Sequence, residues 1–182
     1  MTTELVVTRH GPAGALALRD EILPVYVTAE AAQMGDPWFG PDKFWERLEN
    51  LYAPSKGFEL VAGRLDGVLV GYVFGSPIGK TADIWEAVAK NLPDIPVADT
   101  SASVFIFREF QVHPDQQNRG YGRKLHDKLL SARPESLAHL SVRPDNVQAR
   151  GAYFSWGWRK LGEHRPKPDW PLFETLVREL PL

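Results

Sequence analysis

Three consecutive segments decide the fold: VFIFREFQV at residues 104–112, QNRGYG at residues 117–122 and RKLHDKLL at residues 123–130. The first is rich in β-branched and aromatic residues and predicts a buried strand, and the last predicts a helix. The glycines between them let the backbone take unusual dihedral angles and let a ligand approach closely. The unpaired N–H groups of the helix's first turn lie at the positive end of its dipole. We therefore predict a phosphate- or pyrophosphate-binding turn at residues 117–122.

The glycine spacing limits which phosphate ligand this turn can hold. It matches neither GxxxxGK[ST], typical of nucleoside triphosphate sites, nor GxGxxG, typical of dinucleotide sites. A second segment, NVQARGAYFSWGW at residues 146–158, follows a short predicted strand at 140–143. Asn146 is a favourable helix cap and Gly157 a favourable helix end, whereas Gly151 lies in mid-helix. Together the two segments resemble the Q/R-x-x-G-x-G/A and N-x-x-A-x-x-small-Y-x-x-x-G-aromatic signatures of the GNAT superfamily of N-acetyltransferases.

The resemblance covers residues 58–180 and implies a fold, a cosubstrate and a set of binding residues. The implied fold is a single α/β (α+β) domain over residues 1–182, with a mixed, mostly antiparallel sheet, helices on both faces and one splayed parallel strand pair. The implied cosubstrate is acetyl-CoA, without a metal. The residues that it assigns to acetyl-CoA are Phe110, Gln111, Val112, Gln117, Asn118, Arg119, Gly120, Tyr121, Gly122, Arg123, Asn146, Ala149 and Tyr153.

The resemblance also implies roles for two backbone groups and for the basic residues of the turn. The N–H of Phe110 is expected to face the acetyl oxygen, and Val112 to pair with the pantetheine amide like an added strand. Arg119 and Arg123 are expected to neutralise phosphate groups of CoA. A solvated basic patch is the alternative for the arginines, and core packing describes the two apolar side chains equally well.

Direct transfer of an acetyl group to an amine requires a base for the ammonium, a donor for the oxyanion and a proton for the departing thiolate. The chain has no cysteine, which this route does not need and which disfavours a thiolate nucleophile. By resemblance, Tyr153 is the general acid. The alternative for Tyr153 is an amphipathic core residue with a hydrogen-bonded hydroxyl.

Glu109 is the candidate base. Strand alternation places it on one face with Phe105, Phe107 and Gln111. A carboxylate among aromatic side chains is usually paired or functional, and apolar neighbours raise its pKa. A structural ion pair with Arg108 or another arginine is the alternative. The five histidines follow no zinc-binding spacing.

Composition bounds the class of protein. A chain of 182 residues fits one domain, and 43% apolar with 24% charged residues is ordinary for a soluble globular protein. A net charge of −2 gives no case for nucleic-acid binding by bulk electrostatics. The sequence shows neither a membrane-length apolar run nor a signal-like start, so we expect a cytoplasmic protein without a membrane partner. A homodimer is left open.

The remaining elements are predicted from periodicity and from turn residues. A strand is expected at 5–9, and a helical stretch at 15–34 that Pro24 should break or kink. A helix at 41–52 precedes a hairpin, 58–64 and 68–74, around Asp66-Gly67. A short helix at 82–90 and a closing antiparallel pair, 158–163 with 173–180, complete the list.

The sequence thus predicts an acetyl-CoA-dependent N-acetyltransferase acting on a small-molecule primary amine by a ternary-complex mechanism. A peptide or protein amine, a non-catalytic CoA-binding module and the transfer of other acyl groups or to oxygen are the alternatives. The acceptor pocket is expected near an aromatic and acidic set of residues and in the segment 76–100. That set comprises Trp38, Phe39, Trp45, Tyr72, Phe74, Trp85, Asp36, Asp42, Asp83 and Glu86.

Overall fold

The computed structural model describes residues 4–182, which form one seven-stranded sheet in the order β1-β2-β3-β4-β5-β7-β6. The strands β4 and β5 pair in parallel, and the pairs β1–β2, β2–β3, β5–β7 and β7–β6 are antiparallel. This is the mixed, mostly antiparallel sheet that the sequence predicts. The strands are β1 (Val6–His10), β2 (Glu59–Leu65), β3 (Val68–Ile78), β4 (Val104–Val112), β5 (Leu137–Val142), β6 (Arg159–His164) and β7 (Phe173–Glu179).

Six α-helices connect these strands within the described residues. They are α1 (Pro12–Leu16), α2 (Arg19–Ala29), α3 (Pro41–Arg47), α4 (Ala82–Asn91), α5 (Tyr121–Leu130) and α6 (Val147–Ser155). A π-helical turn, Leu48–Tyr52, extends α3. Of the two predicted effects of Pro24, a break or a kink, the break is wrong, because Pro24 lies inside α2. Its ring is exposed, while Ile22 and Tyr26 on the same helix are buried and hold it against the core.

Two compact units divide the chain. The first unit contains the residues up to Ser76 together with Arg108–Ala132, and the second contains Pro77–Phe107 with Arg133–Leu182. β4 contributes to both, since its boundary falls between Phe107 and Arg108. Each unit has its own set of packed side chains.

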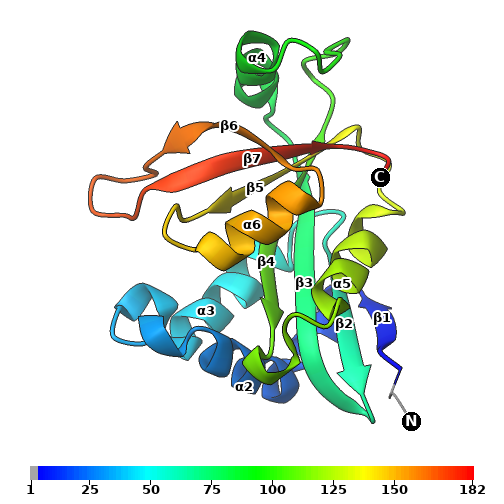
Figure 1. The fold of residues 1–182 in the computed structure, drawn as a ribbon, viewed down its shortest axis with the longest axis vertical. Coiled ribbons are helices and arrows are strands. Elements are labelled where there is room, and N and C mark those ends of the chain that lie inside the picture. Colours follow the sequence, from blue (N-terminus) through cyan, green and yellow to red (C-terminus); the bar gives the residue numbers. More distant parts are fainter. Residues whose placement is uncertain (1–3) are drawn as a thin grey trace. The chain divides into compact units, whose positions relative to one another are not determined.

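In the first unit, α2 and α3 cover one face of the β2–β3 hairpin (Figure 1). Tyr26 of α2 stacks on Phe44 of α3 with ring centroids 3.9 Å apart, and both join Tyr72 and Phe74 of β3 in a single apolar cluster. The hairpin turn itself is as predicted, since Asp66 and Gly67 have the positive φ angles that a tight turn of this kind needs.

Helix α5 packs on the opposite face of the same hairpin. Its buried Leu125 lies over Gly63 and Gly71, where an added Cβ would meet Leu125 methyl groups at 3.0 and 2.9 Å. Small residues in the sheet therefore let α5 approach the backbone of β2 and β3 closely. This contact fixes the helix that begins at the predicted phosphate-binding turn.

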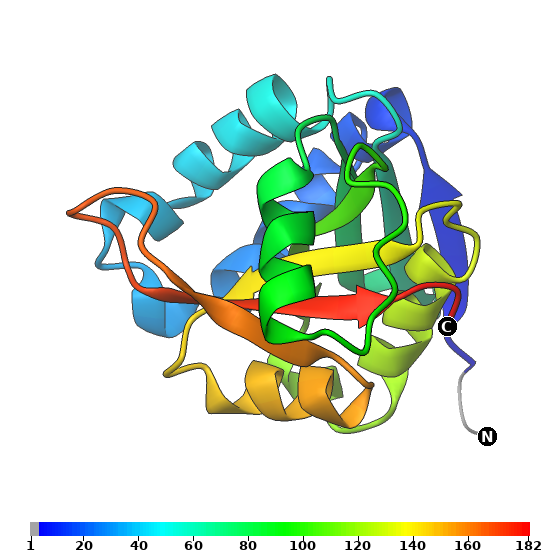
Figure 2. The same cartoon turned by 90° about the horizontal axis from the view of Figure 1, so that it is seen from above.

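In the second unit, β7 lies between β5 and β6, so the predicted closing pair joins the sheet through its second strand. Helix α4 covers one face of these strands and α6 the other (Figures 1 and 2). Trp85 and Val88 of α4 pack with Leu137 of β5 and Val177 of β7. The parallel register joins β4 to β5 from Phe105 opposite Ala138 to Phe107 opposite Leu140.

Substitution of Gly71 tests the close packing of α5. We expect Gly71→Ala to lower the free energy of unfolding by about 1–3 kcal/mol, because its methyl group would also meet the carbonyl oxygen of Gln111 at 3.0 Å. Gly151→Ala is the matched control. It lies in α6 with open space around the added Cβ, so it should stabilise the protein by about 0.5–1 kcal/mol. Urea unfolding measures both, and equal effects would contradict this packing.

Candidate active site

The glycine-bearing turn has the backbone that an anion site needs. Asn118 and Gly120 both take left-handed conformations, with φ of 60° and 80°. Gly120 is the N-cap of α5, and no side chain caps that end of the helix. The N–H groups of the first helical turn therefore remain available as donors at the positive end of the dipole. Gln117 ties the turn to the end of β4, because its amide Nε2 donates to the Val112 carbonyl at 3.0 Å.

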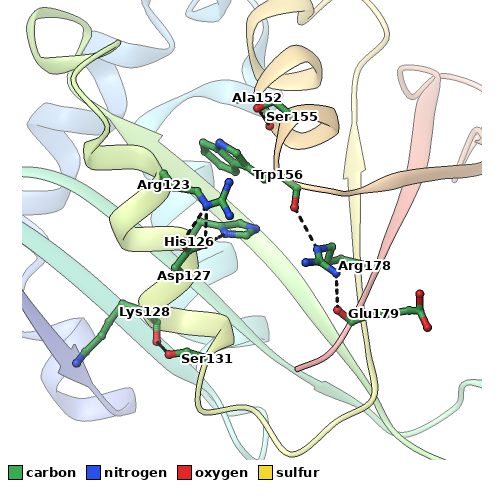
Figure 3. A network of polar contacts seen from close by, with 10 residues as sticks. All are labelled: Arg123, His126, Asp127, Lys128, Ser131, Ala152, Ser155, Trp156, Arg178 and Glu179. Atoms are coloured by element: carbon green, nitrogen blue, oxygen red, sulfur yellow. Dashed lines mark hydrogen bonds and ion pairs between the residues drawn. The ribbon is translucent and has the colours of Figure 1, made fainter. Parts of the chain in front are cut away.

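Arg123 on α5 is engaged within its own helix (Figure 3). Its Nε lies 2.9 Å from both carboxylate oxygens of Asp127, one helical turn further on. Asp127 also contacts Nδ1 of the fully buried His126 at 2.7 Å. A phosphate that binds Arg123 would share it with Asp127, whereas Arg119 in the turn is exposed.

Glu109 lies on β4 in a cluster of polar groups of the first unit, and its side chain is half-buried. Nε2 of Gln111 donates to one oxygen of Glu109 at 3.0 Å and to one oxygen of Glu30 at 2.6 Å. Burial and the nearby Glu30 charge raise the pKa of Glu109 from 4.5 to about 7, although the Gln111 hydrogen bond and the Arg47 charge oppose the shift. Glu109 therefore titrates near neutral pH, as a general base should.

The proposed ion pair between Glu109 and Arg108 is absent from the described residues. Arg108 is exposed, and its guanidinium lies 5.2 Å from the ring centroid of Tyr52. Arg47 supplies the positive charge that acts on Glu109. Its guanidinium donates to the Trp38 carbonyl at 2.9 Å and stacks over the Trp38 ring at 4.2 Å.

Tyr153 lies on α6 in the second unit and is 7% exposed. Its ring meets Phe107 and Trp158 at centroid distances of 6.2 and 5.9 Å. Its backbone also closes the helix, because the Trp158 N–H donates to the Tyr153 carbonyl and the Gly157 N–H to the Phe154 carbonyl. This pair of bonds, with Gly157 at φ 89°, forms a Schellman motif. Sequence and packing therefore hold Tyr153 at a defined place on α6.

The start and end of α6 agree with the sequence prediction. The Asn146 side chain accepts a hydrogen bond from the Ala149 N–H at 3.2 Å and so caps the helix. At the other end, Nε of Arg178 on β7 donates to the Trp156 carbonyl at 3.1 Å (Figure 3). Arg150 of α6 forms an ion pair with the buried Glu174 of β7, with Nε and Oε2 2.6 Å apart. Helix α6 is thus fixed to β7 at two positions.

The predicted site residues fall into two groups. The first unit holds Glu109, the segment 110–112 and the turn 117–123, and the second holds Asn146, Ala149 and Tyr153. Sequence reasoning missed Glu30, Arg47 and the role of Tyr72, which join Glu109 only through tertiary packing. No short-range pattern marks them, because Glu30 is simply the residue that follows α2.

Several of the residues that were expected to line the acceptor pocket are part of the core or cap a helix. Trp45, Tyr72, Phe74 and Trp85 are buried core residues. The Asp36 carboxylate accepts from the Trp38 N–H at 2.9 Å and caps a short 3₁₀ helix. These aromatic residues therefore mark the core here, and of the four only Tyr72 carries a hydroxyl on which the charges of Glu109 and Glu30 act.

A family model described as the acetyltransferase (GNAT) family matches residues 24–158. The chain belongs to the GNAT family of acetyltransferases. N-alpha-acetyltransferase RimI of Mycobacterium tuberculosis is 29% identical over 157 residues, which are 84% of this chain and 80% of that protein.

Solved structures share the GNAT fold over nearly the whole chain. PH1933 from Pyrococcus horikoshii OT3 has a TM-score of 0.70 at 18% identity, covering 98% of this chain and all of its own. The PaiA N-acetyltransferase from Thermoplasma acidophilum, in complex with coenzyme A, has a TM-score of 0.60 at 9% identity, covering 97% of this chain and 99% of its own.

None of the helices within residues 4–182 combines the length and the apolar character needed to cross a bilayer. Within the same residues, no three His, Cys, Asp or Glu side chains gather as a metal ion would require.

The raised pKa of Glu109 predicts how stability depends on pH. Because the folded state holds this proton more tightly than the unfolded chain, stability falls as the pH rises from about 4.5 to about 7. The shift corresponds to at most about 3 kcal/mol. Glu109→Gln should remove this component and have a higher free energy of unfolding than wild type at pH 8. Urea unfolding from pH 4 to pH 8 measures it, with the exposed Glu49→Gln as control. A variant that keeps the wild-type slope would place Glu109 in a solvated environment.

Proposed function

We propose that this GNAT protein transfers the acetyl group of acetyl-CoA directly to a primary amine, with Glu109 as base and Tyr153 as acid. The observation that carries the proposal is the half-buried Glu109, whose pKa of about 7 suits proton removal at neutral pH. The turn at 117–122, with its left-handed Gly120 and uncapped helix start, supports a binding role toward the CoA phosphates. Membership of the GNAT family supports acetyl-CoA as the donor.

The proposed steps balance without a covalent enzyme intermediate. Glu109 takes a proton from the acceptor ammonium, and the neutral amine attacks the thioester carbonyl. The tetrahedral oxyanion is held by the N–H of Phe110 until the C–S bond breaks. Tyr153 gives its proton to the thiolate of CoA, and the attacking nitrogen releases its second proton to solvent as the amide forms. Solvent then returns a proton to Tyr153 and takes one from Glu109. Asn146 and Ala149 contribute by holding the helix that carries Tyr153.

The pKa of Glu109 also bears on which amines are accepted. Proton transfer to a base with a pKa of about 7 costs about 1 kcal/mol from an α-ammonium, whose pKa is about 8. It costs about 5 kcal/mol from an alkyl ammonium, whose pKa is about 10.4. The base therefore fits acceptors of low pKa. A small-molecule primary amine of this kind is the first candidate acceptor.

The α-amine at the start of a polypeptide is the second candidate. It has the same low pKa, and the relative from Mycobacterium tuberculosis is an N-alpha-acetyltransferase. Release of CoA thiol distinguishes the two candidates when acetyl-CoA is offered with small α-amines, alkyl amines and short peptides. Propionyl- and succinyl-CoA in parallel define the acyl preference. No thiol release with any of these amines would favour a non-catalytic CoA-binding protein.

Gly120→Asp tests the phosphate-binding turn. At CoA concentrations a hundredfold above the dissociation constant, wild type should gain about 2.7 kcal/mol of stability, seen as a melting shift. The added carboxylate should abolish that shift by repelling phosphate. Gly67→Asp introduces the same residue at the same kind of φ in the β2–β3 hairpin and should keep the shift. Gly120→Asn adds a side chain of similar size without the charge, and it should keep part of the CoA-induced melting shift. An unchanged CoA shift in Gly120→Asp would refute the site.

Tyr153→Phe tests the general acid. Loss of the proton donor should lower kcat by about 10²–10⁴-fold with little change in acetyl-CoA affinity. The phenyl ring preserves the contacts with Phe107 and Trp158, so the fold should persist. Trp156→Phe alters a ring packed against Tyr153 but leaves its hydroxyl, and should stay close to wild type. Single-turnover rates report the chemical step, and a wild-type rate in Tyr153→Phe would assign that residue to the core.

A further inference from the structure

Glu30 brings a second carboxylate to the candidate base from a different part of the chain. It follows α2, whereas Glu109 lies on β4, and both carboxylates accept from the same Gln111 amide nitrogen, at 2.6 and 3.0 Å. The two accepting oxygens are therefore no farther apart than two hydrogen-bond lengths. That spacing fits one nitrogen that donates to both carboxylates, which is what a primary ammonium can do.

Tyr72 supplies an independent reason to place a ligand here. Its side chain is fully buried, and within residues 4–182 its hydroxyl has no hydrogen-bond partner. A buried hydroxyl without a partner is costly, so such groups are usually satisfied by a ligand or by water. Burial raises the pKa of this phenol well above its ordinary value, and the nearby charges of Glu109 and Glu30 add to the shift.

The strand register places Tyr72 beside the Gln111 amide that contacts both carboxylates. The His113 N–H donates to the Val70 carbonyl at 2.7 Å, which sets β3 and β4 in register at that point. Counting two residues from this pair, forward along β3 and back along β4, places Tyr72 opposite Gln111. Their side chains then lie on the same face of the sheet. Gln111 and Tyr72 are thus cross-strand neighbours, and the Gln111 amide contacts Glu30, the residue that follows α2.

We propose that Glu30, Glu109 and the Tyr72 hydroxyl form the subsite that receives the acceptor's ammonium group, with Gln111 setting the spacing. Its three acceptor groups match the three N–H donors of a primary ammonium. The proposal rests on the proposed function and adds Glu30 and Tyr72 as specificity residues. Glu30 and Tyr72 bind the ammonium, whereas Glu109 binds it and then accepts its proton.

The charges of the subsite define the class of acceptor. The two carboxylates carry two negative charges, and Arg47 supplies one positive charge nearby. The remaining negative charge can be neutralised by a single ammonium. Tyr26 and Tyr52, the other ionisable groups around Glu109, stay neutral, because burial raises the pKa of each phenol. An acceptor with a carboxylate beside its amine would bring a negative charge toward Glu30 and Glu109. The preferred acceptor is therefore an amine whose neighbouring group is uncharged, such as an α-amino amide.

Matched acceptors test this subsite. Alaninamide and alanine share the amine and the methyl group. They differ in the charge beside the amine and therefore also in the pKa of the amine, so the test is how Glu30→Gln changes the preference between them. We expect wild type to use alaninamide at least 10-fold better than alanine in kcat/KM. Glu30→Gln should raise KM for alaninamide by about 10-fold or more, because a local negative charge is lost. For the same reason it should lower the ratio of kcat/KM for alaninamide to that for alanine. Tyr72→Phe should raise KM by a smaller factor. Glu49→Gln, which removes an exposed carboxylate of the same unit, should match wild type.

Binding without transfer separates this proposal from the proposed function. The melting shift that alaninamide causes in CoA-loaded protein needs no acetyl transfer, and it should be lost in Glu30→Gln and retained in Glu49→Gln. A shift that depends on Glu30, without acetylation of any amine, would support the subsite and overturn the proposed function. The subsite alone would be overturned if Glu30→Gln acetylated alaninamide with an unchanged KM. It would also be overturned if wild type used alanine better than alaninamide. Neither a shift nor acetylation with any amine would overturn both.

Discussion

The close approach of α5 to bare backbone is the constraint on which the first unit depends. Leu125 occupies the space over Gly63 and Gly71, where side chains on β2 and β3 would otherwise lie. The helix can approach the backbone of β2 and β3 this closely only because both positions lack a Cβ. Since α5 begins at Gly120, this contact also fixes the turn whose N–H groups are candidates for phosphate binding. Packing in the core and the geometry of the candidate site are therefore set by the same contact.

A second constraint is the cost of a carboxylate held among apolar and aromatic groups. Glu109 could lower that cost through an ion pair, but its neighbours supply an amide, a second carboxylate and a more distant arginine charge instead. The protein accepts a raised pKa and the loss of stability at high pH that follows from it. Such an arrangement lowers the free energy of unfolding at high pH, and it is typical of groups that exchange protons in a reaction.

The two units bring different chemistry. The first combines the turn that we propose to bind phosphate with a cluster of two glutamates, three tyrosines and an arginine. The second holds a tyrosine whose ring is packed by Phe107 and Trp158 and whose helix is tied to β7 by Arg150 and Arg178. A residue held this firmly is suited to a proton transfer in which its hydroxyl must point in one direction.

The sequence by itself determined the elements with strong local signals. The strand at 104–112 and the helix at 147–155 have the predicted bounds, because β-branched and aromatic alternation, the Asn146 cap and the Gly157 end are all short-range features. The Asp66-Gly67 hairpin and the parallel pairing of the strands before and after α5 followed in the same way. Two motifs in the correct order indicated the GNAT family, which the family comparison confirmed.

Only the tertiary structure decided what surrounds these elements. Pro24 continues a helix that local rules would end, because Ile22 and Tyr26 bury enough surface to offset the lost hydrogen bond. The order β5-β7-β6 depends on pairing between segments far apart in the chain. Glu30 meets Glu109 across 79 residues through the Gln111 amide, a contact that no sequence periodicity encodes. Local propensity sets the strands and helices, whereas long-range packing determines which charges become neighbours and hence their pKa.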